Sequence, residues 1–375
     1  MQGSLMRSET VKFGTLDGMR GLAAILIAMR HTGAFFKPID FTESFLAVDL
    51  FFVLSGVVIC HAYEARIVSG LSIGRFAWVR LVRIYPLYFV GAALAVGAHA
   101  LQGDWPGDLS IQVALVLIPD LAATMLFPLN GPAWSLFFEL VANVAYAALV
   151  RSLTPRRIAG IIAVAAVMMV VLVFIGRRHS LDIGWTVKSI AGGFARVAFS
   201  FTAGVAIHRL YAGQAAPPRL VRLAAHPLVP CLLLAVVGTI LTSAPAPALQ
   251  PYYELATVIL VFPALVYLSL FCQPQGHFAT LCQLAGLVSY PLYAIHAPIG
   301  QLMEAGFGAA IGDHAPWIGI PFLAALLAFC AALAHGYDAP VRRYLLRRTA
   351  ARRSSAVNPA SLNVASAQRS DECSK

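Results

Sequence analysis

Two basic side chains in the first apolar segment, Arg20 and His31, have a spacing that suits chemistry inside a membrane. They are eleven residues apart, which is close to three helical turns, so a helix places both on one face at heights that differ by about 16 Å. Asp17 lies three residues before Arg20 on the same face, where the two can form an ion pair. Charged side chains in a bilayer cost from about 2.5 kcal/mol upward, and they usually mark a function.

Three other apolar segments each carry an ionisable residue that we expect in the outer half of the membrane: Asp49 in "VDLFFVLSG", Glu139 in "PAWSLFFEL" and His296 in "LVSYPLYAIH". Together with His31 they are predicted to converge on one polar cavity. Two histidines and two carboxylates suit acid–base chemistry. His31 would act as general base, or as nucleophile, while Glu139 or Asp49 orients its other ring nitrogen. A proton-coupled transporter or flippase would use the same groups as proton relays.

Two arginines in "RLVRIYPLY", Arg80 and Arg83, are three residues apart and therefore adjacent on one helical face. Paired guanidinium groups bind phosphates through forked, charge-assisted hydrogen bonds. Arginines at this position also serve as ordinary anchors on the cytoplasmic side of a membrane segment. The combination with an acid–base cluster nearer the other side favours phosphate binding.

The composition shows what must position these residues. Of 375 residues, 59% are hydrophobic and only 12% are charged, against about 25% charged in soluble domains, and the mean hydropathy is +0.77. We predict an all-α, polytopic integral protein of the inner (plasma) membrane, with the lipid bilayer as its first partner. The net charge of +10 comes from short basic runs between apolar segments, so no nucleic-acid partner is indicated. The six cysteines show no metal-ligand spacing, and no metal is expected.

Ten apolar segments of about 20 residues are predicted to span the bilayer, at residues 17–37, 44–63, 84–101, 133–150, 158–176, 187–210, 227–244, 252–271, 281–303 and 316–337. The basic loops favour a topology with both termini in the cytoplasm. Arg177 and Arg178 do not fit that topology. Residues 109–128 are expected to be re-entrant or interfacial.

This topology divides the chain into three parts. Residues 1–15 are the expected cytoplasmic N-terminus, without a removable signal peptide, and residues 16–340 form the membrane domain. Residues 341–375 are basic and poor in large apolar side chains, which predicts a disordered cytoplasmic tail.

The sequence resembles the membrane-bound acyltransferase-3 family in five blocks that come in the family's order: "LDGMRGLAAILIAMRH", "VDLFFVLSG", "RLVRIYPLY", "PAWSLFFEL" and "LVSYPLYAIH". The blocks lie across residues 16–296. The resemblance implies a ten-helix enzyme that takes an acyl group, usually acetyl, from cytoplasmic acyl-CoA. It also implies an acceptor hydroxyl on an extracytoplasmic or lipid-linked glycan, such as an exopolysaccharide of the cell envelope.

The resemblance further implies essential roles at four matching positions, which are Arg20, His31, Arg80 and Arg83. Glu139 matches the Glu of the Trp-Ser-Leu block. We expect acyl-CoA, acetyl-CoA in the simplest case, to place its phosphates at Arg80 and Arg83 and its arm along the Arg20 face. The thioester then ends near His31.

Three residues around the expected cavity, Trp134, Ser135 and Tyr293, are candidates for contacting the sugar. Arg30 stands where the family resemblance leads us to expect an apolar or aromatic residue, and it would serve as an anchor or contact an anionic acceptor. Some relatives carry a fused extracytoplasmic hydrolase-like domain. We expect none here, so that the transfer is completed in the membrane domain or by an extracytoplasmic partner.

Overall fold

The structure is a computed structural model that describes residues 13–105, 107–176, 179–213, 218 and 226–357. Within these residues the regular secondary structure is helical, apart from one isolated bridge between Met125 and Thr186. In chain order the α-helices are α1 (Gly14–His31), α2 (Ala47–Val68), α3 (Ile73–Gln102), α4 (Asp108–Leu115), α5 (Ala133–Leu149), α6 (Pro155–Ile175), α7 (Ile190–Gly213), α9 (Leu228–Thr242), α10 (Gln250–Ala256), α11 (Phe262–Ser269), α12 (Gly276–His314), α13 (Gly319–Leu333) and α14 (Ala339–Val357). The shorter 3-10 and π segments are η1 (Gly33–Phe35), η2 (Thr42–Leu46), η3 (Val150–Ser152), η4 (Val187–Ser189), η5 (Thr257–Val261) and η6 (Ala334–Asp338).

Each of the ten predicted spans overlaps a helix or a run of consecutive helices. Among the described residues, eight helices are long and apolar enough to cross a membrane. The two remaining predicted spans correspond to α1, which carries Asp17, Arg20 and Arg30, and to α9, which has only 15 residues. The number of ten spans and the cytoplasmic position of the termini therefore stay predictions. Segment 109–128 holds only the eight-residue helix α4 and irregular chain.

Close helix contacts at glycines position the functional segments. α1 packs most extensively against α12, which also packs against α3, and α2 packs against α7. A Cβ atom added at Gly21 of α1 would lie 2.3 Å from the Cβ of Ala285 in α12. One added at Gly56 of α2 would lie 2.1 Å from the carbonyl oxygen of Phe201 in α7. Only glycine permits these approaches, which are typical of helix packing in membranes.

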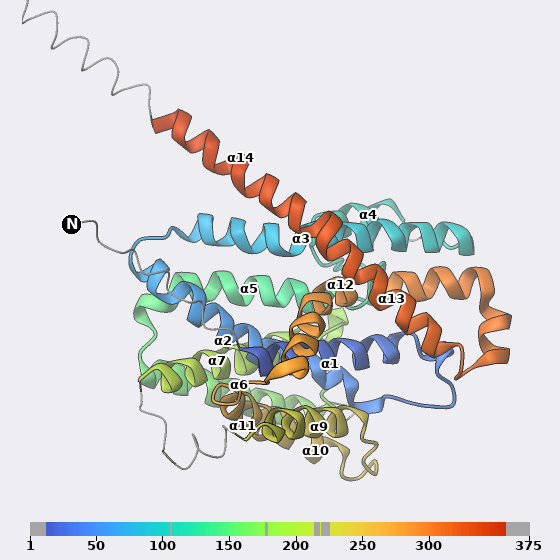
Figure 1. Cartoon of the computed structure of the whole chain (residues 1–375), viewed down its shortest axis with the longest axis horizontal. Coiled ribbons are helices and arrows are strands. Elements are labelled where there is room, and N and C mark those ends of the chain that lie inside the picture. The colour runs from blue at the N-terminus through green and yellow to red at the C-terminus, as the bar shows by residue number, and fades with distance from the viewer. Residues whose placement is uncertain (1–12, 106, 177–178, 214–217, 219–225, 358–375) are drawn as a thin grey trace, which may run out of the picture.

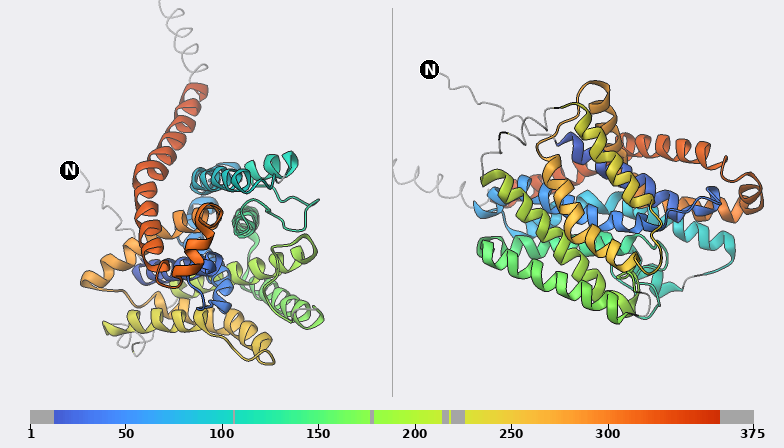
Figure 2. Two further views of the ribbon diagram at one scale, coloured as in Figure 1. Left: turned by 90° about the vertical axis from the view of Figure 1, so that its right-hand side faces the viewer. Right: turned by 90° about the horizontal axis from the view of Figure 1, so that it is seen from below.

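The end of the described chain is one continuous helical rod made of α13, η6 and α14, and it extends beyond the bundle (Figure 1; Figure 2, left). Residues 341–357, expected in a disordered tail, are thus part of a helix. The remainder of that tail, 358–375, lies outside the described residues, as do Arg177, Arg178 and the first twelve residues of the predicted N-terminal segment.

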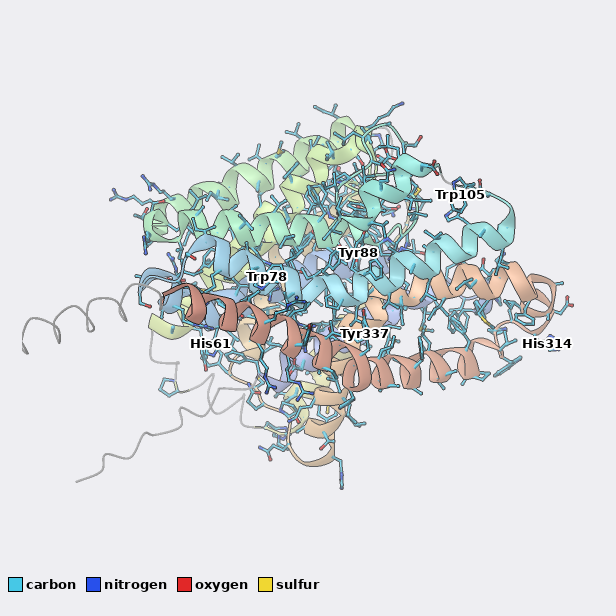
Figure 3. The ribbon with its side chains drawn as sticks, turned by 90° about the horizontal axis from the view of Figure 1, so that it is seen from above. His61, Trp78, Tyr88, Trp105, His314 and Tyr337 are labelled. Atoms are coloured by element: carbon cyan, nitrogen blue, oxygen red, sulfur yellow. The ribbon has the colours of Figure 1, made fainter. Side chains whose placement is uncertain are left out.

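The bundle has two ends that matter for function. α1 and α3 run toward the same end, and α2 returns in the opposite direction (Figure 1). We name the end at which α1 finishes the His31 end; it also holds Trp105 and His314, whereas His61 lies at the opposite end (Figure 3). The functional side chains of α1 therefore lie at two different levels of the bundle.

Candidate active site

A cavity of about 170 Å³ lies between α1, α2, α3, α5 and α12. We call it the arginine cavity, because three guanidinium groups and one carboxylate contribute to its wall. Its polar lining consists of Arg20, Arg80, Arg83, Glu139, Ser55, Ser135, Ser289, Tyr290 and Tyr293. The structure thus brings together the three arginines that the sequence singled out from two distant segments.

Two of these arginines are held by carboxylates that do not line the cavity. Arg20 donates from Nη2 to Oδ1 of Asp17 at 2.5 Å and from Nε to Oγ of Ser289 at 3.1 Å. Arg83 lies 3.5 Å from Oδ2 of Asp338. These contacts fix the guanidinium groups at the cavity wall and leave further N–H donors for a ligand, since each guanidinium carries five.

The third arginine, Arg80, pairs with Glu139. Its Nη2 donates to Oε1 of Glu139 at 3.1 Å, and the Ser55 hydroxyl donates to the same oxygen at 2.8 Å. The Nε of Arg80 is buried and has no hydrogen-bond partner among the described residues. A buried donor on a charged group is costly when unpaired, so an anion in the cavity would satisfy it. The prediction that Glu139 orients His31 is wrong, because Glu139 pairs with Arg80 and Ser55, whereas the ring nitrogen of His31 that it was expected to hold pairs with His296.

At the His31 end, the Nδ1 of His31 lies 3.0 Å from the Nε2 of His296. His296 is fully buried on α12, and its Nδ1 lies 2.8 Å from the carbonyl oxygen of Leu292. His31 is the last residue of α1 and its side chain is exposed. We call these two residues the histidine pair.

The contacts of the histidine pair fix its neutral tautomers. The Leu292 carbonyl only accepts hydrogen bonds, so the Nδ1 of His296 carries the proton and its Nε2 has the lone pair. The Nδ1 of His31 must therefore donate to His296. This arrangement leaves the lone pair of His31 on Nε2, where it is able to accept a proton from a substrate.

Asp49 does not reach the histidine pair. Its carboxylate accepts from Arg196 of α7, with Nη2 to Oδ2 at 2.6 Å and Nε at 3.2 Å from both oxygens. Both side chains are fully buried, and Nη1 of Arg196 donates to the Ile183 carbonyl at 2.8 Å. The expected orienting role of Asp49 is wrong: it fastens α2 to α7. Sequence reasoning missed Arg196, although a charge inside the apolar segment 187–210 was the signal that could have found it.

The three expected sugar contacts lie in different places. Trp134 is only 7% exposed and lies against the Arg196 guanidinium, 5.3 Å from ring centroid to Cζ, so it is not available to a sugar. Ser135 and Tyr293 line the arginine cavity, where their hydroxyl oxygens are 2.6 Å apart. The Tyr293 ring is also 5.9 Å from the His296 ring. Tyr293 therefore connects the arginine cavity with the histidine pair.

Four ionisable groups were predicted in one cavity, and the structure distributes them over three places. Glu139 lies in the arginine cavity, Asp49 lies in the buried pair with Arg196, and the two histidines meet at the His31 end. In the part of the chain that the structure describes, no three His, Cys, Asp or Glu side chains come together to hold a metal ion. The arrangement offers an anion site and, separately, an imidazole nitrogen that carries a lone pair.

Arg30, whose role the sequence left open, contacts two neighbouring segments of the chain. Its Nη1 donates to the Thr42 carbonyl at 2.5 Å, and its Nη2 lies 3.5 Å from Oδ2 of Asp182. The guanidinium also lies over the Phe45 ring, 5.4 Å from its centroid. Arg30 anchors the last turn of α1 to the chain around it.

Comparison with known proteins identifies the family. The acyltransferase-3 family, described as an acyltransferase domain, matches residues 13–335, and the chain therefore belongs to it. "Protein 2 in picA locus" of Rhizobium radiobacter is 37% identical over 188 residues, which are 44% of this chain and 97% of that protein. "Exopolysaccharide production protein ExoZ" of Rhizobium meliloti is 27% identical over 329 residues, which are 84% of this chain and 93% of that protein. No solved structure matches the chain.

Proposed function

Proceeding from membership of the acyltransferase-3 family, we propose that this enzyme moves an acyl group, acetyl in the simplest case, from acyl-CoA to a hydroxyl of a polysaccharide or lipid-linked glycan. The observation that carries the proposal is the separation of two centres along α1. Arg20 faces a cavity suited to phosphates, and His31, about 16 Å further along the helix, presents a basic nitrogen. A relative named for exopolysaccharide production supports a polysaccharide acceptor.

The donor half of the reaction belongs to the arginine cavity. Arg80 and Arg83 bind the phosphates of acyl-CoA, which enters from the cytoplasm, and the unpaired Nε of Arg80 is one of the donors. Arg20 flanks the pantetheine arm, which passes Tyr293 toward the histidine pair. For the donor to enter from the cytoplasm, the enzyme lies in the inner membrane with both termini on the cytoplasmic side, as the basic loops predict.

The chemical step belongs to the histidine pair. Nε2 of His31 takes the proton from an acceptor hydroxyl while the oxygen attacks the thioester carbonyl, and CoA then leaves as the thiolate and receives that proton. His296 accepts a hydrogen bond from the imidazolium that forms and so stabilises its charge. General-base catalysis of this kind contributes about 10² to 10⁴ in rate.

Labelled acyl-CoA supplied only to the cytoplasmic face of membrane vesicles tests the proposal. The acceptor is polysaccharide purified from a deletion strain, offered on the opposite face, and mass analysis reports its acylation. We expect label on the polysaccharide with the wild-type chain and none with His31→Ala at equal abundance. A transporter or flippase needs no acyl donor, so glycan movement without acyl-CoA and without acylation would refute the proposal.

A further inference from the structure

A second cavity, of about 430 Å³, opens at the His31 end between two irregular segments. It shares no lining residue with the arginine cavity. We call it the loop cavity, since it is formed by residues 122–124, which precede α5, and by residues 182–183 and 185–189, which precede α7 and end in the short helix η4. Its volume is in the range of small-molecule and sugar-sized sites, about 300 to 1,000 Å³.

The walls of the loop cavity are held together by backbone hydrogen bonds. Leu126 N–H donates to the Trp185 carbonyl at 2.9 Å, and Val187 N–H donates to the Thr124 carbonyl at 3.1 Å, around the bridge between Met125 and Thr186. Irregular segments are usually mobile, whereas these two are joined as a short antiparallel pair. The cavity is therefore formed before any ligand arrives.

The segment of residues 122–124 is also held in place by the carboxylate of Asp120, which precedes it in the chain. Asp120 accepts hydrogen bonds from the N–H groups of Ala122 and Ala123 at 2.9 and 3.2 Å and from the Ser110 hydroxyl at 2.5 Å. The bond from Ser110 lowers the pKa of the Asp120 carboxyl, which keeps it an ionised acceptor. This wall of the loop cavity thus keeps its shape.

An ion pair connects the loop cavity to the last turn of α1. Asp182 lines the cavity, and its Oδ2 lies 3.5 Å from Nη2 of Arg30, the residue that directly precedes His31. The Asp182 side chain stays 30% exposed, so it retains capacity to accept hydrogen bonds from a ligand. A molecule in the loop cavity would lie next to the end of α1 that presents His31.

The polar lining has the chemistry of a carbohydrate site. It combines an indole (Trp185), a carboxylate (Asp182), hydroxyl groups (Thr124, Thr186 and Ser189) and an amine (Lys188). Sugar rings pack their C–H faces on aromatic side chains, and their hydroxyls bond to carboxylates, hydroxyls and amines. The arginine cavity, in contrast, is lined by three guanidinium groups suited to phosphates.

We propose that the loop cavity binds the acceptor glycan, with a sugar ring against Trp185 and its hydroxyls on Asp182, Thr124 and Lys188. This assignment rests on the proposed acyltransferase function and extends it to the acceptor. In this assignment the tryptophan that contacts the sugar is Trp185, which lines the loop cavity, and not Trp134, which lies outside it. The glycan then lies beside the end of α1 that carries His31, while the donor occupies the arginine cavity.

The test uses the full-length enzyme in membranes and measures each substrate separately. Trp185→Leu and Lys188→Gln are compared with Trp105→Leu and Lys37→Gln, which alter exposed residues at the same end of the bundle. The acceptor is polysaccharide from a deletion strain, and acyl-CoA hydrolysis to water without polysaccharide reports the donor half alone. We expect Trp185→Leu to raise the apparent KM for polysaccharide about three- to tenfold, the size of a lost aromatic contact. The donor KM and the hydrolysis rate should change less than twofold.

A binding measurement makes the outcome independent of turnover. Fluorescently labelled fragments of the same polysaccharide should bind the solubilised wild type and both control variants equally, and should bind Trp185→Leu and Lys188→Gln more weakly. Wild-type binding and wild-type acceptor KM in both loop-cavity variants would overturn this assignment, while intact acyl-CoA hydrolysis would leave the proposed function standing. If the wild type neither hydrolysed acyl-CoA nor acylated polysaccharide, the proposed function would fail and this assignment with it.

Discussion

The Nδ1 of His31 and the Nε2 of His296 lie 3.0 Å apart, although the two residues are separated by most of the chain. His296 is held by the Leu292 carbonyl, so it presents an acceptor to His31 and leaves the lone pair of His31 on its second nitrogen, Nε2. A buried histidine thereby takes the orienting role that carboxylates have in many catalytic sites. The relationship depends on the close packing of α1 on α12.

Replacing His296 should therefore slow the chemical step without weakening the binding of either substrate. His296→Leu removes the acceptor of a charge-assisted hydrogen bond, and a loss of about 1.5–3 kcal/mol corresponds to roughly 10- to 150-fold in kcat. His296→Gln keeps an acceptor oxygen and should retain more activity than His296→Leu. Initial rates at varied acyl-CoA and polysaccharide check this. Equal activity of the two variants would show that no hydrogen bond to His31 matters.

Arg80 should determine donor affinity. Arg80→Lys keeps the charge but loses the fork that matches phosphate oxygens, so the apparent KM for acyl-CoA should rise about tenfold or more while turnover at saturation changes less. Arg75→Lys, at an exposed position on the same helix, is the matched control. If both variants gave the wild-type acyl-CoA curve, Arg80 would be a topology anchor, for which lysine is equivalent.

The Asp49–Arg196 pair should matter for folding and not for substrate affinity. Removing one partner leaves a buried, unpaired charge, which costs about 3–5 kcal/mol, so Asp49→Leu should lower abundance and Tm in detergent. The double variant Asp49→Leu with Arg196→Met should recover much of that loss, because apolar pairs replace buried ion pairs well. A double variant that folds fully yet lacks all acylation would instead place the pair in the catalytic machinery.

Gly56 should tolerate no side chain. Gly56→Ala places a Cβ atom 2.1 Å from the Phe201 carbonyl oxygen, and forcing α2 from α7 should cost about 1–3 kcal/mol of stability. Gly160→Ala on α6 is the control, since nothing lies within 4 Å of its added Cβ. Thermal unfolding in detergent distinguishes them. A Tm for Gly56→Ala at or above that of Gly160→Ala would contradict the close packing.

Cysteine labelling in intact cells checks the proposed sidedness. In a chain with Cys231 and Cys373 replaced by alanine, Ala248→Cys should react with an impermeant thiol reagent, since the 245–250 loop lies at the His31 end. Ser69→Cys, exposed between α2 and α3 at the other end, should react only after the cells are permeabilised. The reverse pattern would put the arginine cavity on the wrong side for cytoplasmic acyl-CoA.

The sequence by itself determined the helical class and the position of the helices, because segments of about 20 apolar residues leave a membrane chain few alternatives. It also singled out Arg20, Arg80 and Arg83, since charges in or beside apolar segments are costly and therefore informative. His31 and His296 were placed at one depth for the same reason. Helical period alone put Arg20 and His31 on one face at different heights.

The tertiary structure decided which of these groups meet. The depth of a side chain in the membrane is only one of its coordinates. Its partners depend on how each helix is rotated about its axis and on which helices lie beside it. Close contacts such as that of Gly21 with Ala285 set both. Asp49 and Glu139 were expected at His31, but they form ion pairs with Arg196 and Arg80 instead. The loop cavity arises from backbone pairing between two irregular segments, and no periodic pattern in the sequence reports such pairing.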